Sequence, residues 1–315
     1  GADTLTVKTI WADGTVKTET VKYGQKLTAK QIENLTDNGN VFAVEADTNV
    51  PSVDEAIMND ITITYSVATV KENASAKGLN ISAEGNNWKI SSKDTSWAAA
   101  IMSGTSKTHY AKYVVNKTAG AERSEQFGFT VSDGTKRILL CLWPHKDNSG
   151  NYRVLTVGNC GWAKVGIQSA GESAAKNKLF SSEASTMTLE MYLVENTVYY
   201  YVDGVLITSV AVNNTVFGDN ALDTAKEYTI GLATYRTNFG ITNYYTDFEH
   251  MYGEDALGKY NCVAFNFAQG SADVKGVGNG VFVTATSAAA FSALIQNSEI
   301  VKNKGFVVET KIATN

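Results

Sequence analysis

The sequence repeats one of its own segments, and this repeat limits the folds open to the chain more than any other feature. The separation between the two copies is about the size of one domain. We therefore expect a module that ends near Gly253 and a second copy that begins near Lys259 and contributes only its opening strands. The matching segments, separated by 193 positions (85 to 278, 113 to 306), are residues 85–91 with 278–284, 99–101 with 292–294, and 113–115 with 306–308.

Length and charge exclude several functional classes. A chain of 315 residues is long enough for two or more domains with buried cores. The net charge of −5 leaves no basic face, so nucleic acid and anionic membranes are not expected partners. No apolar run approaches the roughly 20 residues that span a bilayer, so membrane insertion is not expected either.

The local signals are almost all those of β-strands. Only 2 prolines occur, while threonine, valine, tyrosine and serine are abundant, as half-buried strands prefer. A short helix is expected at 29–35 with Thr28 as its N-cap, and 288–296 is expected to form a helical turn or a buried strand. Short strands separated by turn signals predict an all-β sandwich or barrel. The turn signals are Asp13-Gly14, Asn38-Gly39, Asp133-Gly134 and Asp203-Gly204.

The first 69 residues are expected to form a small separate domain. A hairpin is predicted from 4–10 and 15–23, followed by the helix and by strands at 41–46 and 61–65. The turn Val21-Lys-Tyr-Gly-Gln-Lys-Leu27 and the later Ile-Thr-Ile-Thr strand resemble the β-grasp-like repeats of bacterial surface proteins, the Listeria–Bacteroides type. Gly-Asn-Val-Phe42 stands where that family has a glycine-aromatic-tryptophan segment. The resemblance implies a spacer domain without chemistry.

Residues 70–254 contain a series of hairpin motifs in a characteristic order. Gly-Phe-Thr-Val-Ser-Asp-Gly134 is followed by Tyr-Val-Asp-Gly204, then by Ile-Gly-Leu232, and finally by Asp-Phe-Glu249. This series resembles a concanavalin A-like (laminin-G-like) two-sheet jelly-roll sandwich, a group that includes lectins, carbohydrate-binding modules and glycoside hydrolases. The repeat then makes residues 259–315 a truncated second copy, so the chain is expected to belong to a protein with tandem repeats.

The acidic residues do not match a hydrolase. Retaining glycoside cleavage needs two carboxylates about 5 Å apart, which a strand supplies at alternating positions on one face. Asp247 and Glu249 share a face, but no third acid follows, and Glu190 and Glu195 point to opposite faces. We therefore predict a protein that is not an enzyme.

Carbohydrate sites combine an aromatic platform with polar donors and acceptors. The densest such group lies between positions 143 and 162, where Trp143 ends one predicted strand and Tyr152 begins the next. Core burial is the alternative for each tryptophan taken alone. The predicted ligand-binding residues of this group are Trp143, His145, Asn148, Tyr152, Arg153 and Trp162.

A second group precedes the last strand of the sandwich. Tyr235 and Arg236 are its predicted ligand-binding residues, with Arg236 able to clamp a sugar carboxylate through two hydrogen bonds. The alternative is a surface arginine paired with a neighbouring aspartate. In Tyr199-Tyr-Tyr201, period two places Tyr200 toward the core and the other two outward. Trp88 and Trp97 are expected in the core.

Neither cysteines nor histidines form a metal motif. Three cysteines, widely spaced, do not indicate a disulfide framework or a zinc site, and Cys141 is expected to be a small buried side chain. No HExxH motif occurs, so no metal is assigned and no cofactor is expected beyond a structural calcium ion. The candidate calcium ligands, which have no defining spacing, are Asp133, Asp147, Asn148, Asp219 and Asn220.

The sequence thus predicts a non-catalytic, lectin-like carbohydrate-binding module of a secreted or cell-surface bacterial protein. Its expected partner is a glycan or a glycoprotein of the host or its matrix. The alternative is a protein-binding adhesin or a structural stalk without a sugar site, because the same sandwich serves both purposes.

Overall fold

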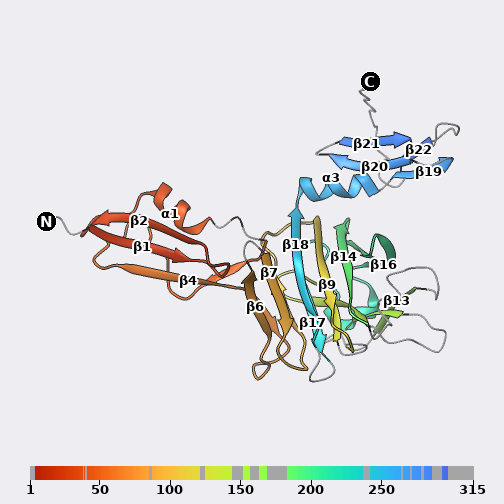
Figure 1. Ribbon diagram of the computed structural model, residues 1–315, viewed down its shortest axis with the longest axis horizontal. Coiled ribbons are helices and arrows are strands. Elements are labelled where there is room, and N and C mark those ends of the chain that lie inside the picture. The colour runs from red at the N-terminus through yellow and green to blue at the C-terminus, as the bar shows by residue number, and fades with distance from the viewer. Residues whose placement is uncertain are drawn as a thin grey trace. The chain divides into compact units, whose positions relative to one another are not determined.

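The computed structural model divides into two compact units, Gly1–Tyr252 and Gly253–Asn315, and each is described by itself (Figure 1). For Glu84, Trp143, Val205, Ile207, the strands 152–156 and 163–168, and all residues after 260, the backbone alone is described. The described residues are 4–37, 39, 41–84, 87–120, 125–143, 152–156, 163–168, 183–236, 242–263, 265–269, 272–277, 280–285 and 293–296.

The chain begins with a four-stranded sheet of order β2-β1-β4-β3. β1 (Thr4–Ile10) and β2 (Val16–Lys22) form the predicted hairpin around Asp13-Gly14. β4 (Ile61–Val67) pairs parallel to β1 and antiparallel to β3 (Val44–Ala46), so the sheet is mixed.

One helix, α1 (Ala29–Thr36), accompanies this sheet and confirms the prediction. Thr28 Oγ1 accepts the Gln31 backbone N–H at 3.2 Å, and the Gln31 side chain accepts the Thr28 N–H at 2.9 Å. This reciprocal capping box satisfies two donors that the helix leaves open. The core between this helix and the four-stranded sheet consists of Val7, Val21, Leu27, Leu35 and Ile57.

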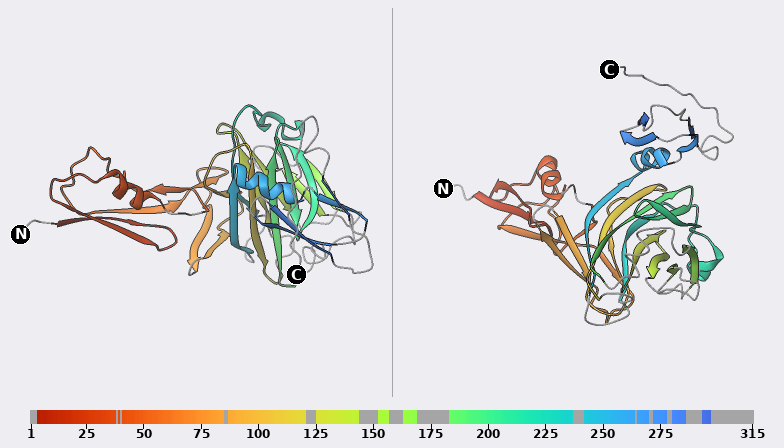
Figure 2. Two further views of the ribbon diagram at one scale, coloured as in Figure 1. Left: turned by 90° about the horizontal axis from the view of Figure 1, so that it is seen from above. Right: turned by 45° about the vertical axis from the view of Figure 1, so that its right-hand side comes forward.

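The rest of the first unit is a sandwich of two seven-stranded sheets, which confirms the predicted all-β jelly roll (Figure 2). Sheet one, of order β13-β12-β11-β10-β17-β8-β5, contains β5 (Thr69–Lys71), β8 (Ala98–Ile101), β10 (Glu125–Ser132), β11 (Arg137–Trp143), β12 (Tyr152–Thr156), β13 (Ala163–Gln168) and β17 (Thr229–Arg236). Sheet two, of order β16-β15-β14-β9-β18-β7-β6, contains β6 (Leu79–Glu84), β7 (Asn87–Ser92), β9 (His109–Lys117), β14 (Ser185–Val194), β15 (Thr197–Val202), β16 (Val205–Ala211) and β18 (Tyr244–Tyr252). A 3₁₀ segment, η2 (Thr215–Asn220), follows β16.

Aspartate–glycine turns join neighbouring strands where the sequence predicts them. Gly134 and Gly204 have φ of +92° and +78°, and Asp203 has +46°. Positive φ at both central residues is the type I′ geometry whose twist matches a hairpin, so Asp203-Gly204 is a I′ turn between β15 and β16.

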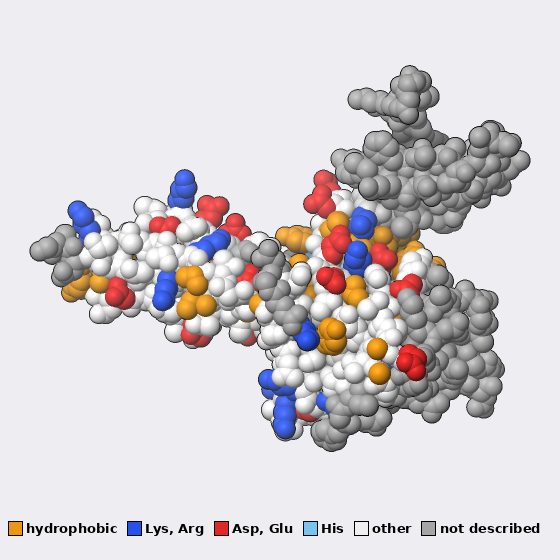
Figure 3. Space-filling model, in the orientation of Figure 1, with side chains coloured by type: hydrophobic (Ala, Val, Ile, Leu, Met, Phe, Trp, Pro, Cys, Tyr) orange, Lys and Arg blue, Asp and Glu red, His pale blue; other side chains and the backbone are white. Residues whose placement is uncertain are grey.

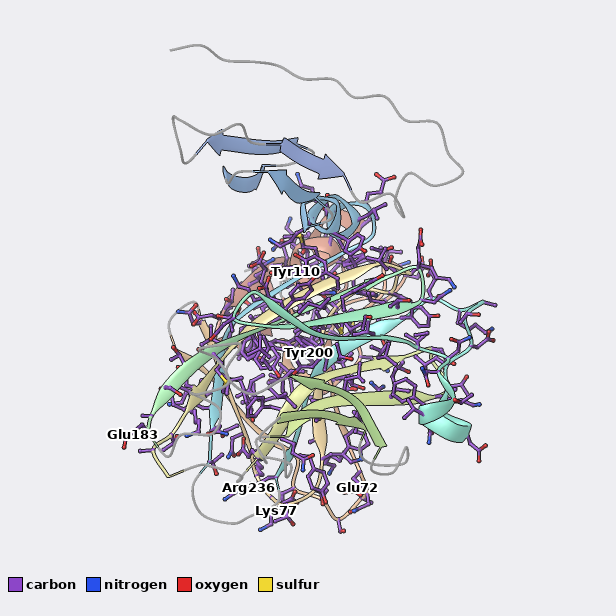
Figure 4. The ribbon with its side chains drawn as sticks, turned by 90° about the vertical axis from the view of Figure 1, so that its right-hand side faces the viewer. Glu72, Lys77, Tyr110, Glu183, Tyr200 and Arg236 are labelled. Carbon is purple, nitrogen blue, oxygen red and sulfur yellow. The ribbon has the colours of Figure 1, made fainter. Side chains whose placement is uncertain are left out.

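The main core lies between the two sheets. Val198, Tyr200 and Val202 all point into it, as period two predicts, and Figure 4 shows Tyr200 between the layers. Tyr201 faces outward but is half-buried, with its ring 5.7 Å from that of Tyr192. Trp88 is buried in this core, where the edge of Phe42, from the N-terminal segment, packs 5.8 Å from it.

Two phenols of sheet two hold β10 from across the core. The Tyr200 hydroxyl donates to the Phe127 carbonyl at 3.1 Å, and the Tyr113 hydroxyl donates to the Gly128 carbonyl at 2.8 Å. A Cβ on Gly128 would collide with the Leu140 carbonyl oxygen. These hydrogen bonds from sheet two to the backbone of β10 therefore fix the distance of β10 from the opposite sheet.

The second unit contains a helix and four strands among its described residues. α3 (Glu254–Val263) is followed by β19 (Phe265–Gln269), β20 (Ala272–Val277), β21 (Gly280–Ala285) and β22 (Ala293–Gln296). β22 confirms the strand that was one of two predictions for 288–296; the residues before it lie outside the described ones. None of the described helices is long and apolar enough to cross a membrane.

Candidate functional site

The described members of both groups of predicted ligand-binding residues lie on one sheet. Trp143 ends β11, Tyr152 and Arg153 begin β12, and Tyr235 and Arg236 end β17. All three strands belong to sheet one. The sheet thus brings together residues about 90 positions apart in the sequence. His145, Asn148 and Trp162 lie outside the described residues.

Strand register places several of these residues in one line across the sheet. Tyr235 pairs with Gln126 on β10. Trp143 pairs with Arg153 on β12. The last β10–β11 pair is Phe127 with Leu142, so the next step places Gln126 beside Trp143. Because paired residues share a face, Tyr235, Gln126, Trp143 and Arg153 occupy one line of positions on the same face.

The line continues in the other direction. β17 and β8 pair up to Thr234 with Ala98, and the next step places Tyr235 beside Trp97. The Glu72 backbone N–H donates to the Trp97 carbonyl at 3.1 Å, which extends the pairing by one more strand. We call this line the cross-strand row: Glu72, Trp97, Tyr235, Gln126, Trp143 and Arg153.

The row lies on the face of sheet one that points away from the main core. Phe127 and Phe129 alternate with Gln126 along β10 and are both in the core between the sheets. The opposite face carries a second, smaller apolar cluster against which Tyr235 packs, half-buried. The cluster consists of Trp97, Ala99, Leu139, Cys141 and Ala233, with Val70, Ile101 and Tyr235 beside it. As predicted, Cys141 is a small buried side chain, and burial raises the pKa of its thiol.

Two polar groups in the row have no hydrogen-bond partner among the described residues. Gln126 is 0 % exposed, and neither its amide nitrogen nor its amide oxygen is paired. The indole nitrogen of Trp97, which is 5 % exposed, is also unpaired. Burying an unpaired polar group costs about 1–3 kcal/mol. The Gln126 amide would therefore be stabilised by a donor or an acceptor that reaches it, and the Trp97 indole N–H by an acceptor.

The structure corrects the expectation for Arg236. Arg236 is 6 % exposed, and it alternates with Tyr235, so it faces the core between the sheets and not the surface. The prediction of a surface arginine was therefore wrong, both as a clamp for a sugar carboxylate and as the partner of a neighbouring aspartate. As expected, Trp143 ends β11 and Tyr152 begins the adjacent strand β12, where the register pairs Trp143 with Arg153, the residue after Tyr152.

Arg236 instead pairs in register with a buried carboxyl, Glu125. Glu125 is 0 % exposed; its Oε2 accepts the Tyr245 hydroxyl, and its Oε1 has no hydrogen-bond partner among the described residues. Burial raises the pKa of Glu125 to about 7, against the opposing effects of the Tyr245 hydrogen bond and the Arg236 charge. Ser92 and Thr234 share a buried hydrogen bond on the same inner face.

Sheet one carries no pair of carboxylates in its described strands. Glu125 is the only acid within those seven strands, and it faces the core. Asp247 and Glu249 are on β18, in sheet two. A bulge between Thr246 and Glu249, with Asp247 at φ +56°, shifts the register there, and Glu249 forms a 3.5 Å ion pair with Lys112. The described strands of sheet one therefore hold only one of the two carboxylates that retaining cleavage needs; Glu72 directly follows β5, in the row on the face opposite to Glu125.

Asp133, a candidate calcium ligand, ties two turns together. Its Oδ1 accepts the N–H groups of Thr135 and Lys136, and its Oδ2 accepts that of Asp223 at 2.9 Å. Although desolvation opposes ionisation, these donors hold the pKa of the Asp133 carboxyl below its usual value. Among the described residues, no three or more His, Cys, Asp or Glu side chains are grouped for a metal ion. Asp147 and Asn148 lie outside the described residues.

Two histidines distant in sequence form a buried pair that the sequence does not reveal. His109 Nε2 lies 2.7 Å from the Tyr228 carbonyl and 3.0 Å from the Ser106 carbonyl, so the network assigns it the proton. His109 Nδ1 then accepts from His250 Nε2 at 3.0 Å. Burial lowers the pKa of both rings, and for His250, which also lies beside His109, to about 3. Both rings are therefore neutral at pH 7.

This pair predicts that acid destabilises the fold. The folded pKa of His250 lies below the unfolded value of 6.5, so stability is lost as the pH falls from 6.5 toward 3. Urea unfolding should show a loss of roughly 2 kcal/mol between pH 6.5 and 4.5 from this group. His250→Gln, which keeps a donor for His109, should remove that part of the pH slope; an unchanged slope would contradict the assignment.

Comparisons with known proteins show similarity at the level of structure only. No family model and no curated protein matches the sequence. Among solved structures, a functionally unknown protein from Saccharomyces cerevisiae is 10% identical with a TM-score of 0.41, covering 59% of this chain and 96% of its own. The carbohydrate binding module CBM66 from Bacillus subtilis is 10% identical with a TM-score of 0.36, covering 58% and 95%. A Bacillus licheniformis beta-glucanase is 13% identical with a TM-score of 0.35, covering 59% and 92%. At these TM-scores the similarity carries no argument about activity or ligand.

Proposed function

We propose that the cross-strand row is a carbohydrate-binding surface and that the protein is a non-catalytic, lectin-like binding module. The row consists of three aromatic residues, one amide, one cation and one acid, and such side chains together stack on sugar rings and bond their hydroxyl groups. Strands lie about 4.8 Å apart, so from Trp97 to Arg153 the row spans roughly 19 Å, a length suited to an oligosaccharide.

The observation that carries this proposal is the partly exposed ring of Tyr235 on the outer face of sheet one, paired in register with the unpaired amide of Gln126. This amide is buried beside an apolar cluster, where an unpaired amide is unfavourable. A hydroxyl group acts as donor and acceptor and so satisfies either end of an amide. Tyr235, half-buried beside Gln126, is the described aromatic side chain at which a sugar ring would stack.

Three further assignments accompany the proposal. Residues 1–69 are a β-grasp-like spacer, supported by the mixed sheet of order β2-β1-β4-β3 with one helix. Residues 70–254 are a concanavalin A-like domain. The protein is secreted or displayed on a bacterial cell surface, and its partner is a glycan or glycoprotein. Figure 3 shows Lys, Arg, Asp and Glu interspersed over the described surface in that view, without a large patch of one sign.

A glycan microarray of the intact chain, followed by calorimetry on the best ligand, tests the proposal. Tyr235→Ala and Trp143→Ala should each weaken binding about 10-fold, the effect of losing one stacked ring. Gln126→Met, similar in volume but without the amide, should weaken it about 3- to 10-fold, as expected for one or two neutral hydrogen bonds. Loss of binding with a chelator would reveal a calcium ion in the site.

Tyr199→Ala is the matched control, because this half-exposed tyrosine lies on β15 of sheet two. It should bind as the unmodified chain does. Glycan binding that survives Tyr235→Ala and Trp143→Ala would move the site elsewhere. An array without any binding, together with binding to a surface protein stripped of glycans, would favour the protein-binding adhesin; no binding to either would favour the stalk.

A further inference from the structure

The second unit repeats a hairpin of sheet two with the same register. β6 pairs with β7 from Leu79–Ser92 to Glu84–Asn87. β20 pairs with β21 from Ala272–Ala285 to Val277–Gly280. Each position of the second hairpin thus corresponds to the position 193 residues earlier in the first hairpin. The register agrees with the separation seen in the sequence repeat.

A second pair of strands is also repeated, at a slightly larger separation. β5 pairs with β8 through Thr69–Ala100, Val70–Ala99 and Lys71–Ala98. β19 pairs with β22 through Phe265–Gln296, Asn266–Ile295 and Phe267–Leu294. Both strands have moved by 196 positions. The structure therefore corrects the ungapped alignment of 99–101 with 292–294: β8 corresponds to a β22 segment three residues further along.

In the first sandwich, one strand of each of these pairs has a second neighbour on its other side. β8 pairs on its other side with β17, through Gly231–Ile101 to Thr234–Ala98. β7 pairs on its other side with β18, through Tyr244–Ser91 and Tyr245–Ile90. In the described part of the second unit, β21 and β22 each have one neighbour, in sheets of two strands. The edges used by β17 and β18 therefore have no described counterpart there.

We propose that residues 265–296 are the opening strands of a second sandwich, and that the edges of β22 and β21 that lack a neighbour among the described residues accept a pair of strands equivalent to β17 and β18. Two-stranded sheets are marginal on their own, and open edges bind further strands. The expected strands are recognisable by sequence: an Ile-Gly-Leu-like strand, with glycine where the backbones approach closely, followed by an aromatic-rich Tyr-Tyr-Thr-Asp-Phe-like strand. Gly231 has that role in β17, since a Cβ there would collide with the Ala100 carbonyl.

A chimera built from this chain alone tests the proposal. Because residues 113–115 align with 306–308, position 315 corresponds to 122, so residues 123–252 are appended after Asn315. The appended strands should complete the second sandwich. Hydrogen exchange read by mass spectrometry should then slow for the amides of β20, β21 and β22 by at least about 100-fold relative to the unmodified chain.

The matched control carries the same appended segment with Leu232→Pro and Tyr245→Pro in the appended copy only. Proline removes the ladder donor from each strand, so protection of β20, β21 and β22 should return to that of the unmodified chain. Equal exchange in the chimera and in the control would overturn the proposal.

Exchange in the unmodified chain provides a second test that does not depend on folding of the chimera. The proposal expects the alternate amides of β21 that face away from β20 to exchange fast, since that edge has no neighbour among the described residues. Protection of those amides at every concentration would mean that the chain itself already covers the edge. Protection that rises with concentration would assign the edge to a second copy of this chain. Either result would overturn the proposal.

Discussion

Gly128→Ala is expected to reduce the free energy of unfolding by about 3 kcal/mol or more, and with it to abolish any binding by sheet one. The methyl group would meet the carbonyl oxygen of Leu140 on the neighbouring strand. Backbone cannot rotate away as a flexible side chain does, so β10 must shift. A shift also breaks the bonds that Tyr113 and Tyr200 donate to the carbonyls of Gly128 and Phe127. Gln126 is only two residues away, so the cross-strand row moves with the strand.

Gly134→Ala is the matched control for this substitution. Gly134 is in the turn after β10, at φ +92°, and a Cβ there would meet nothing within 4 Å. It should cost only the strain of a non-glycine residue at positive φ, about 1–2 kcal/mol. Chemical denaturation of both variants gives the comparison. A Gly128→Ala variant no less stable than Gly134→Ala would contradict the tight contact between β10 and β11.

Much of the fold follows from local patterns in the sequence. The alternation along residues 198–202 assigns Tyr200 to the core, and Asp203-Gly204 places the next turn. The capping box at Thr28 marks the start of α1. These signals involve neighbours in the chain, where one dihedral preference or one period of two decides the outcome.

The candidate site follows less directly, because it depends on pairing between distant strands. Tyr235 and Trp143 stand out by composition, but Gln126 lies in an ordinary apolar strand. Only the register of β10 with β17 places it next to Tyr235. Trp97, assigned to the core from the sequence, is buried in the smaller cluster on the other face of sheet one. Which face a residue takes depends on register, and a shift of one residue reverses it.

The same dependence explains the wrong expectation for Arg236. Arginine is seldom buried unless it is paired, and its partner Glu125 lies more than 100 positions earlier, beyond the reach of any local pattern. The pairing of β10 with β17 brings the two together. Tyr245, from sheet two, supplies the hydrogen bond to the carboxyl.

Glu125→Gln is expected to stabilise the protein at neutral and alkaline pH. The folded pKa of Glu125, about 7, lies above the unfolded value of 4.5. Such a group contributes its full stability below pH 4.5, and this contribution is lost as the pH rises through 7. At 1.4 kcal/mol per pKa unit, the loss above pH 7 is roughly 3 kcal/mol. Glutamine mimics the neutral acid and keeps an oxygen for the Tyr245 hydroxyl, so it avoids this loss.

Urea unfolding at pH 4 and pH 8 measures the effect. At pH 4 the variant and the unmodified protein should agree to within about 1 kcal/mol, and at pH 8 the variant should be more stable by roughly 2–3 kcal/mol. Using the difference between two proteins cancels the opposite pH trend of the His109–His250 pair. Glu249→Gln, which removes the partly exposed ion pair with Lys112, should change stability by less than about 1 kcal/mol at either pH. If Glu125→Gln is instead less stable at pH 8, the Arg236 charge outweighs desolvation and Glu125 is ionised in the fold. That result would exclude a stability cost from the Glu125 carboxyl. Glu125 and Arg236 would then form an ordinary buried ion pair on the inner face of sheet one.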